Sequence, residues 1–266
     1  MDISLGLGKG WEVSPAGGAT GEAYIARYEG KNKLFLKRNS SPFLAVLSAE
    51  GIVPKLIWTK RMENGDVITA QHWLQGRELK PIDMTNQAVA NLLSKIHHSK
   101  ELLYMLQRLG KKQHSPKELL VELKRKLNST PIYEDILMTS VLFLEDELQF
   151  INLENLGVCH CDVNHNNWLI SDNQELYLID WDGAMIADPA LDLGPLLYSY
   201  IPKEGWKEWL AYYGEELTPD LEKRMQWYFI YQAISLCLWY KKRNEENQYC
   251  QLINRLEKMV YSFPRK

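Results

Sequence analysis

One pair of motifs constrains this chain more than any other part of its sequence. The first reads H-x-D-x-x-x-x-N, with His160, Asp162 and Asn167 at its defined positions. The second reads Ile-Asp-Trp-Asp and places Asp180 thirteen residues after Asn167. Between them, residues 168–179 favour two short strands joined by a turn. The spacing therefore predicts a β-hairpin that holds polar side chains on the loops next to its strands.

These residue types suit phosphoryl transfer, which depends on positioning and on cations that spread the developing charge. Asp162 could accept a hydroxyl proton and orient that hydroxyl toward the γ-phosphate of ATP. Asn167 and Asp180 supply the hard oxygen ligands that Mg²⁺ prefers. His160 is expected to hold the loop rather than to transfer protons. The alternative is that all of these residues only cap turns, but the complete pattern flanked by strands favours a nucleotide-dependent site.

Two further acids follow the second motif. Asp182 is compatible with a substrate contact, with a second metal site or with a solvated turn, and the sequence leaves these alternatives open. Asp192 precedes an apolar run. A buried carboxylate at that position must accept hydrogen bonds, and we expect them to come from the backbone of the catalytic loop.

A glycine-rich segment and a lysine provide the phosphate side of the predicted site. Gly17, Gly18 and Gly21 lie between strand-like runs, where glycines let the backbone approach phosphates. An ordinary hairpin turn would have the same composition. Lys37 closes the run Leu-Phe-Leu-Lys about sixteen residues later, from which it could reach the α- and β-phosphates.

Two further elements complete the predicted nucleotide site. Glu50 lies in the short helix expected between the two hairpins of the front region and is the best candidate partner for Lys37. Residues 71–74 precede Gly76 and are expected to form the hinge, where backbone groups would meet adenine. Gln71 and Trp73 are therefore assigned to nucleotide binding.

The order of the elements predicts an α+β, bilobal fold. Residues 1–76 read as a β-rich nucleotide-binding lobe and residues 77–266 as a mainly helical catalytic and substrate lobe, with the ATP cleft between them. In the front region, the expected strands are 23–28, 33–37, 57–61 and 67–73, with a brief helix within 42–51. In the back region, helices are expected to start at Thr85, Ser115, about Tyr133 (ending at Gly157) and Thr218.

Composition excludes several other classes of protein. The net charge of −3 over 266 residues argues against broad nucleic-acid binding. Neither a signal peptide nor an apolar run long enough to span a membrane is visible, so a cytoplasmic protein is expected. The four cysteines form no disulfide framework. Cys159-His160-Cys161 makes a poor zinc site without a second pair, and the two thiols are expected to be reduced and to lie on a buried strand.

Taken together, these residues resemble the aminoglycoside phosphotransferase and choline kinase family, which has a protein-kinase-like fold, and the match covers nearly the whole chain. The resemblance implies that Asp162 is the catalytic base, that Asn167 and Asp180 hold Mg²⁺ and that Lys37 contacts ATP. It also implies that His97, in Leu-Ser-Lys-Ile-His, is structural. The glycine segment departs from the G-x-G-x-x-G of protein kinases. Asp192 follows Asp180 by only twelve positions, which is too short an interval for a regulated activation segment and favours a small-molecule substrate.

The resemblance to known proteins reduces the number of candidate substrates. The chain is similar to bacterial cell-cycle regulators within the family, which would imply a ribose, 2-deoxyribose or nucleoside-like substrate. It would also imply a role linking division, through the division protein FtsZ, to replication, with localisation at the division site. Trp206 and Trp209 belong to an aromatic back region and could wall the substrate pocket, although packing is the more common use. Aromatic faces also keep choline or thiamine open as substrates.

Two other functions were weighed against a sugar-type kinase: phosphorylation of aminoglycosides, and a scaffold without a main catalytic role. Residues 201–266 carry eleven Lys/Arg against nine Asp/Glu, a net charge of +2 that does not suit polycationic aminoglycosides. A kinase-fold scaffold that binds division proteins is the second hypothesis. The intact set of Lys37, Asp162, Asn167 and Asp180 favours an active enzyme over such a scaffold.

Overall fold

The computed structural model describes residues 7–261 apart from 18–20, 131, 133 and 152–154. The chain forms two compact units. Unit 1 comprises Met1–Asp83, Lys100–Gly110 and Asn164–Ala184, and unit 2 comprises Met84–Ser99, Lys111–Val163 and Met185–Lys266. Both units thus draw on separate stretches of sequence, and the lobe boundary at residue 76 stays a prediction.

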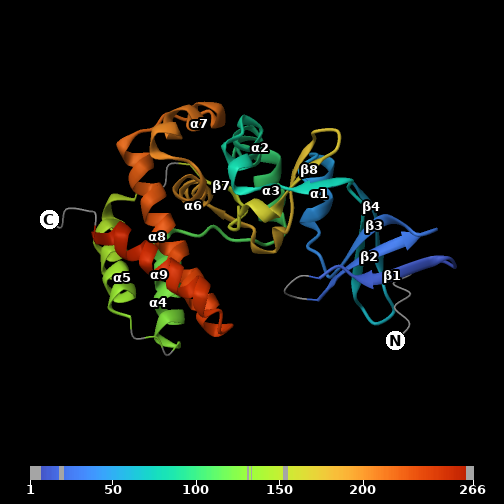
Figure 1. Cartoon of the computed structure of the whole chain (residues 1–266), viewed down its shortest axis with the longest axis horizontal. Helices are drawn as coiled ribbons and strands as arrows, with labels where there is room; N and C mark the ends of the chain where they lie inside the picture. The colour runs from blue at the N-terminus through green and yellow to red at the C-terminus, as the bar shows by residue number, and fades with distance from the viewer. Residues whose placement is uncertain (1–6, 18–20, 131, 133, 152–154, 262–266) are drawn as a thin grey trace. The chain divides into compact units, whose positions relative to one another are not determined.

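Unit 1 is built on a five-stranded antiparallel sheet (Figure 1). Two hairpins supply four of its strands, and the central pairing joins β3 to β5, so that Lys37 pairs with Thr69. The expected strands are confirmed with small changes at their ends. The fifth strand, β1, was not among the expected strands. In spatial order the strands are β1 (Trp11–Pro15), β2 (Ala23–Tyr28), β3 (Lys31–Arg38), β5 (Val67–His72) and β4 (Leu56–Arg61).

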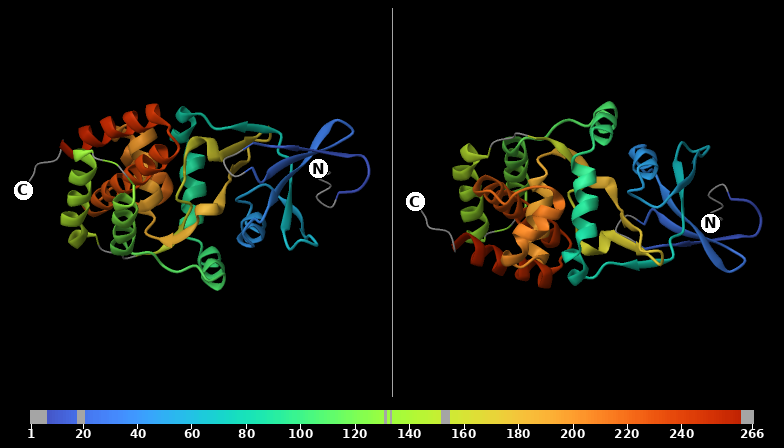
Figure 2. Two further views of the ribbon diagram at one scale, coloured as in Figure 1. Left: turned by 90° about the horizontal axis from the view of Figure 1, so that it is seen from below. Right: turned by 90° about the horizontal axis from the view of Figure 1, so that it is seen from above.

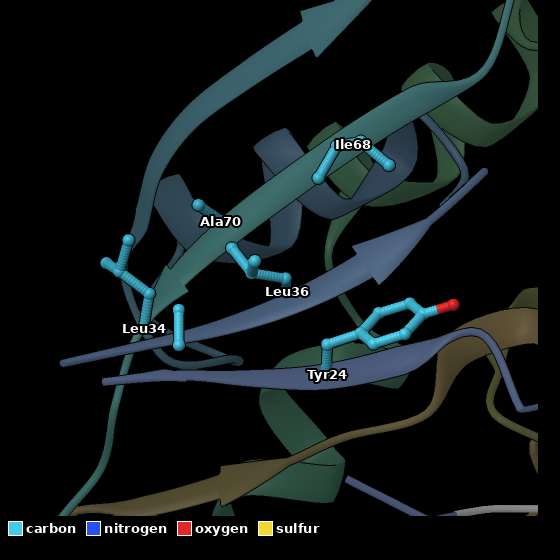
Figure 3. Close-up of a cluster of buried hydrophobic side chains, with 6 residues drawn as sticks. Tyr24, Leu34, Leu36, Ile68 and Ala70 are labelled. Carbon is cyan, nitrogen blue, oxygen red and sulfur yellow. The ribbon is translucent and has the colours of Figure 1, made fainter. Parts of the chain in front are cut away.

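One face of this sheet carries a buried apolar cluster (Figure 3). Its members alternate along the strands, as the period of two for side chains in a β-strand requires. Lys37 follows the fully buried Leu36 and therefore points to the opposite face of β3. The cluster consists of Tyr24, Ala26, Leu34, Leu36, Ile68 and Ala70.

The predicted hairpin at residues 168–179 belongs to a second sheet of unit 1. β8 (Trp168–Ser171) pairs with β9 (Leu176–Leu178), as expected, and its other edge pairs with β6 (Gly76–Glu78). Two helices, α1 (Phe43–Ala49) and α3 (Lys100–Arg108), pack against each other in the same unit. The Leu178 N–H donates to the Ile52 carbonyl, which ties the hairpin to the segment after α1.

Unit 2 is mainly helical and is organised around α8 (Pro219–Lys242), which packs against α4, α5, α6 and α9. In both views of Figure 2 the C-terminal helices, orange and red, lie beside the green helices α4 and α5. A two-stranded antiparallel sheet precedes α6. The other elements are α2 (Gln87–His97), α4 (Pro116–Asn128), α5 (Asp135–Glu147), β7 (Gly157–Cys159), β10 (Met185–Ala187), α6 (Ala190–Tyr200), α7 (Trp206–Tyr213) and α9 (Glu246–Tyr261).

Two of the predicted helix starts are confirmed and one is shifted. Ser115 forms a complete capping box with Glu118, and Thr218 accepts from the Leu221 N–H with proline at the next position. Asn86, rather than Thr85, caps α2, because residues up to Thr85 form a 3₁₀ turn.

The predicted helix end at Gly157 is wrong. Helix α5 ends at Glu147, and Gly157 begins strand β7. A Cβ at Gly157 would lie 2.5 Å from the His97 carbonyl oxygen, so close backbone packing, rather than a left-handed helix cap, requires this glycine. Tyr133, the expected start, lies outside the described residues.

The described part of the chain contains no helix that is both long enough and apolar enough to cross a membrane.

Candidate active site

The two candidate Mg²⁺ ligands are brought together by the backbone of the hairpin in unit 1. Asn167 ends a 3₁₀ turn, and its carbonyl accepts a 2.8 Å hydrogen bond from the Ile179 N–H. Asp180 follows directly in a left-handed conformation, with φ 65°. A non-glycine residue adopts this conformation at a cost, which the surrounding structure must offset. The register of the hairpin therefore fixes the backbone of Asn167 beside the segment that carries Asp180.

Lys37 connects the five-stranded sheet to this segment. Its ammonium lies 3.0 Å from Asp180 Oδ1 and 2.8 Å from Asp182 Oδ2. The Lys37 side chain is 19% exposed, whereas both carboxylates are about half exposed. One cation on β3 thus bridges the two acids of the Ile-Asp-Trp-Asp motif.

The charge of Lys37 is stabilised by these contacts. Burial of the ammonium is the largest single influence and opposes its charge. The hydrogen bonds and negative charges of Asp182 and Asp180 together outweigh burial and raise the pKa of Lys37 above its ordinary value. Lys37 is therefore a cation at any physiological pH.

Lys37 has two carboxylate partners that the sequence did not single out for it, Asp180 and Asp182, which the turn after β9 supplies. They lie 143 and 145 positions further along the chain, so no local pattern joins them to Lys37. Glu50, the partner expected from the sequence, is the C-terminal cap residue of the short helix α1, and its pairing with Lys37 stays a prediction.

The predicted hinge, residues 71–74, begins within the last two residues of strand β5. Gln71 is buried, and its Nε2 donates a 2.8 Å hydrogen bond to the Pro54 carbonyl. The Trp73 N–H donates to the Lys33 carbonyl at 3.0 Å and so extends the pairing with β3. These contacts hold the segment in place, and its adenine-binding role stays a prediction.

The glycine segment joins β1 to β2, as the sequence indicates. Gly17 and Gly21 have φ values of 86° and 67°, which only glycine adopts readily. A Cβ at either position would meet no atom within 4 Å, so the backbone conformation rather than packing requires glycine. Gly18 lies outside the described residues.

In unit 2, the loop that carries Asp162 is anchored by Asp192. The fully buried Asp192 carboxylate accepts the His160 N–H at 2.6 Å and the Cys161 N–H at 2.8 Å. Cys161 is left-handed, with φ 70°. Two successive N–H groups that converge on one carboxylate stabilise such a conformation. The expectation that Asp192 supports this loop is confirmed.

The loop presents Asp162 at the surface and His160 in the interior. Asp162 is exposed, and its N–H donates to His160 Nδ1 at 3.2 Å. A ring nitrogen that accepts a hydrogen bond carries no proton. His160 is fully buried, and its contacts are those of a residue that holds the loop.

A cluster of potential metal-binding groups lies behind this loop and consists of His97, Cys159 and Asp192, whose ligand atoms lie within 4.8 Å of one another. Both nitrogens of His97 are hydrogen-bonded, Nε2 to Asp192 Oδ2 at 3.1 Å and Nδ1 to the Tyr213 hydroxyl at 2.7 Å. The Cys159 thiol donates to the Asp188 carbonyl. Burial raises the pKa of Cys159 well above its ordinary value, so the thiol keeps its proton. His97 and Asp192 are thus hydrogen-bonded to each other, whereas the Cys159 thiol is bonded to a carbonyl outside this pair.

The thiols of the Cys159-His160-Cys161 sequence are both free, but only one of them lies on a buried strand as expected. Cys159 is buried on β7, whereas Cys161 is half-buried in the loop that follows this strand, because β7 ends at Cys159. Burial also raises the pKa of Cys161 well above its ordinary value. Thiols that keep their protons are poor zinc ligands and poor nucleophiles.

The two tryptophans that were candidates for substrate contacts are buried in unit 2. Trp206 and Trp209 are each 2% exposed. Their indole N–H groups donate to the carbonyls of Ile201 and Met84, at 3.0 and 3.1 Å. Such satisfied, enclosed rings belong to packing, which was the alternative considered for these aromatics.

Sequence reasoning missed two relationships in this region. The first is the contact between Lys37 and Asp182, for which the second acid of Ile-Asp-Trp-Asp was the available signal. The second is the link between His97, Tyr213 and Asp192, which no spacing indicates because the three residues lie on α2, α7 and α6.

The chain is similar in sequence to one known family and in fold to several solved structures. Residues 13–228 match the model of the phosphotransferase enzyme family. The fold is similar to that of the choline kinase LicA from Streptococcus pneumoniae (TM-score 0.72, 21% identity, 95% of this chain and 94% of that one). It is also similar to a choline/ethanolamine kinase family protein from Mesorhizobium loti (TM-score 0.70, 15% identity, 97% of this chain and 91% of that one). A third similar structure is the GDP and kanamycin complex of APH(2")-IIIa (TM-score 0.70, 16% identity, 94% of this chain and 93% of that one). The chain belongs to the phosphotransferase enzyme family.

Proposed function

We propose that the chain is a kinase that uses ATP and Mg²⁺ to phosphorylate a hydroxyl of a small molecule. The observation that carries the proposal is the contact of the Lys37 ammonium with the Asp180 carboxylate, 3.0 Å apart. Asn167 is tied to the residue before Asp180 by a backbone hydrogen bond. A phosphate-binding cation beside a pair of oxygen ligands is the combination that phosphoryl transfer uses.

The residues of unit 1 fit Mg²⁺ and a nucleotide. A carboxylate and an amide oxygen are hard ligands, and the Asp180 side chain is 54% exposed, so its oxygens are accessible. Asn167 and Asp180 would hold the ion, which would neutralise charge on the phosphates when bound. Lys37 and the backbone of the segment with Gly17 and Gly21 would contact those phosphates.

Asp162 takes the role of the group that receives the acceptor hydroxyl. Its carboxylate is exposed on a loop whose backbone is fixed by Asp192. A carboxylate that accepts the hydroxyl proton also orients the hydroxyl for attack. His160 supports Asp162 from the interior of unit 2 through the 3.2 Å contact with its N–H.

For the acceptor, we propose a sugar-type hydroxyl, as in ribose, 2-deoxyribose or a nucleoside-like compound. The similarity of the sequence to cell-cycle regulators of the family supports this choice. The similarity in fold to choline kinases supports choline or thiamine as the second candidate. The 2.8 Å contact of Asp182 with Lys37 supports a role for this acid beside the phosphates rather than beside the acceptor.

A cell-cycle role is the more specific part of the proposal. It comprises binding of the division protein FtsZ at the division site and a link between division and replication, and it rests on sequence resemblance. A kinase-fold scaffold that binds division proteins is compatible with the same fold. Activity and scaffolding can coexist in one protein.

The decisive experiment measures Mg²⁺-dependent ATP turnover with a panel of pentoses, nucleosides, choline, thiamine and aminoglycosides. We expect one class of hydroxyl compound to be phosphorylated. The same assay with Asp162→Asn should lose at least about two decades in rate while nucleotide binding is retained. Asp172→Asn, in the exposed turn between β8 and β9, is the matched control and should retain the rate.

Two results would contradict the proposal. Folded protein that binds a division partner but phosphorylates no compound of the panel would favour the scaffold. Equal rates for wild type and Asp162→Asn would remove Asp162 from its assigned role.

A further inference from the structure

The hydroxyl of Tyr213 lies at the far end of a buried series of hydrogen bonds that leads to the Asp162 loop. Tyr213 is the last residue of α7 and is 1% exposed. Its hydroxyl is 2.7 Å from His97 Nδ1. Nothing in the phosphoryl-transfer role assigned above uses this group, although it contacts the His97 ring, which in turn contacts Asp192, the anchor of that loop.

Each step of the series is a direct contact within unit 2. His97 Nε2 lies 3.1 Å from Asp192 Oδ2, and both side chains are fully buried. The same oxygen accepts the His160 N–H, and the other carboxylate oxygen accepts the Cys161 N–H. The Asp162 N–H then donates to the His160 ring. The series therefore ends on the amide of the residue assigned to receive the hydroxyl.

The hydrogen bonds of these groups make the Tyr213 hydroxyl the partner of a buried ring nitrogen. The Asp192 carboxylate already accepts two backbone N–H groups, and its contact with His97 is made by Nε2. The other ring nitrogen, Nδ1, has the Tyr213 hydroxyl as its partner. Whichever of these two groups donates, removing the hydroxyl leaves a buried polar atom without that partner, which costs more than the bond itself contributes.

The loop needs such an anchor because its backbone is unfavourable by itself. Cys161 is left-handed, which is rare for a residue with a side chain. Asp192 holds this conformation only while its own carboxylate is oriented. His97 is a side chain that can orient it, since its Nε2 contacts the same carboxylate oxygen that accepts the His160 N–H.

We propose that Tyr213 is a positioning residue, which acts through His97 and Asp192 to hold the backbone of residues 160–162. Its influence on turnover rests on the proposed function. Its influence on the loop does not, and can be measured without any substrate.

The test compares Tyr213→Phe with Tyr212→Phe. Each variant removes one hydroxyl from α7, but the Tyr212 hydroxyl lies at the surface and contacts Glu208. Amide hydrogen exchange is followed residue by residue by NMR. We expect the His160 and Cys161 amides to exchange roughly tenfold faster in Tyr213→Phe, while amides in the middle of α8 change little. Tyr212→Phe should match wild type at both places.

A second measurement asks whether Tyr213 acts through His97. In a double-mutant cycle with His97→Asn, the effect of Tyr213→Phe on loop exchange should largely disappear, because the intermediate group is already removed. With the acceptor identified by the panel, Tyr213→Phe should lower kcat by roughly three- to tenfold and leave KM for ATP within about twofold of wild type.

Three outcomes would overturn the proposal. The first is equal acceleration of exchange throughout unit 2, which indicates a loss of global stability only. The second is unchanged exchange at His160 and Cys161. The third is a full additive effect of Tyr213→Phe in the His97→Asn background. Absence of turnover in wild type would contradict the proposed function and would leave the exchange measurement as the test of Tyr213.

Discussion

The Lys37 ammonium donates a 2.8 Å hydrogen bond to Asp182 Oδ2, 145 positions further along the chain. The same ammonium contacts Asp180 at 3.0 Å. Both acids of the Ile-Asp-Trp-Asp motif thus contact one cation. They differ in their place on the hairpin, because Asp180 directly follows Ile179, whose N–H donates to the Asn167 carbonyl, whereas Asp182 lies two residues further on.

This difference predicts unequal effects of removing each charge. Asp180→Asn should lower kcat by at least about two decades and raise the Mg²⁺ concentration needed for half-maximal turnover, because a metal ligand is weakened. Asp182→Asn should lower kcat by about tenfold or less and leave the Mg²⁺ dependence unchanged. Mg²⁺ titrations of turnover measure both effects. Equal shifts in Mg²⁺ dependence would show that Asp182 is also a ligand.

Removing the Lys37 charge should weaken binding of phosphates but not of the nucleoside. In Lys37→Met the affinity for ADP should fall by about tenfold or more, while adenosine binding stays the same, since the ammonium is the only part removed. Calorimetry with ADP and adenosine measures the two affinities. Lys33→Met, an exposed lysine on the same strand, is the control and should bind both compounds as wild type does. Equal weakening of ADP and adenosine would place Lys37 away from the phosphates.

The raised pKa of Lys37 predicts how its stabilising effect varies with pH. Because the folded-state pKa lies above the ordinary 10.5, the ion pairs contribute stability below that value and lose it as the pH rises through the folded-state pKa. Urea unfolding of wild type and Lys37→Met should therefore show a constant difference between pH 7 and 9. The difference should shrink above about pH 10.5. A difference that grows in this alkaline range would contradict the assigned ion pairs.

Close helix packing at Gly194 predicts a loss of stability on adding one methyl group. A Cβ at this residue of α6 would lie 2.2 Å from the Met225 carbonyl oxygen of α8. Gly194→Ala should lower the free energy of unfolding by about 1–3 kcal/mol, despite the higher helix propensity of alanine. Gly8→Ala, where an added Cβ meets nothing within 4 Å, should change it little. Urea denaturation measures both, and equal stability of the two variants would contradict the packing.

The four cysteines should differ in reactivity. Cys250 is exposed, whereas Cys159 and Cys237 are buried. Burial raises the pKa of Cys159 and Cys161 well above the ordinary value, so few thiolates form near pH 8. Iodoacetamide should modify Cys250 first in the native protein, without loss of turnover. Peptide mass spectrometry checks this order, and rapid labelling of Cys159 would contradict it.

Local features of the sequence were sufficient for much of the fold. The hairpins of unit 1, the capping box at Ser115 and the capped start at Thr218 follow from turn chemistry and alternation, which act over a few residues. The same holds for the hairpin between Asn167 and Asp180. The end of the α5 segment was misjudged, because a glycine that marks a helix end resembles one required by close packing against His97.

The sequence by itself determined which side chains are candidates for the chemistry of this protein, because spacing along a strand–turn–strand unit decides which side chains share a loop. These candidates are Asp162, Asn167 and Asp180. Only the tertiary structure decided that Lys37 pairs with Asp182, that Trp206 and Trp209 are buried, and that the Tyr213 hydroxyl reaches His97. These contacts join residues up to 145 positions apart. They depend on how strands pair and helices pack, which no local pattern specifies.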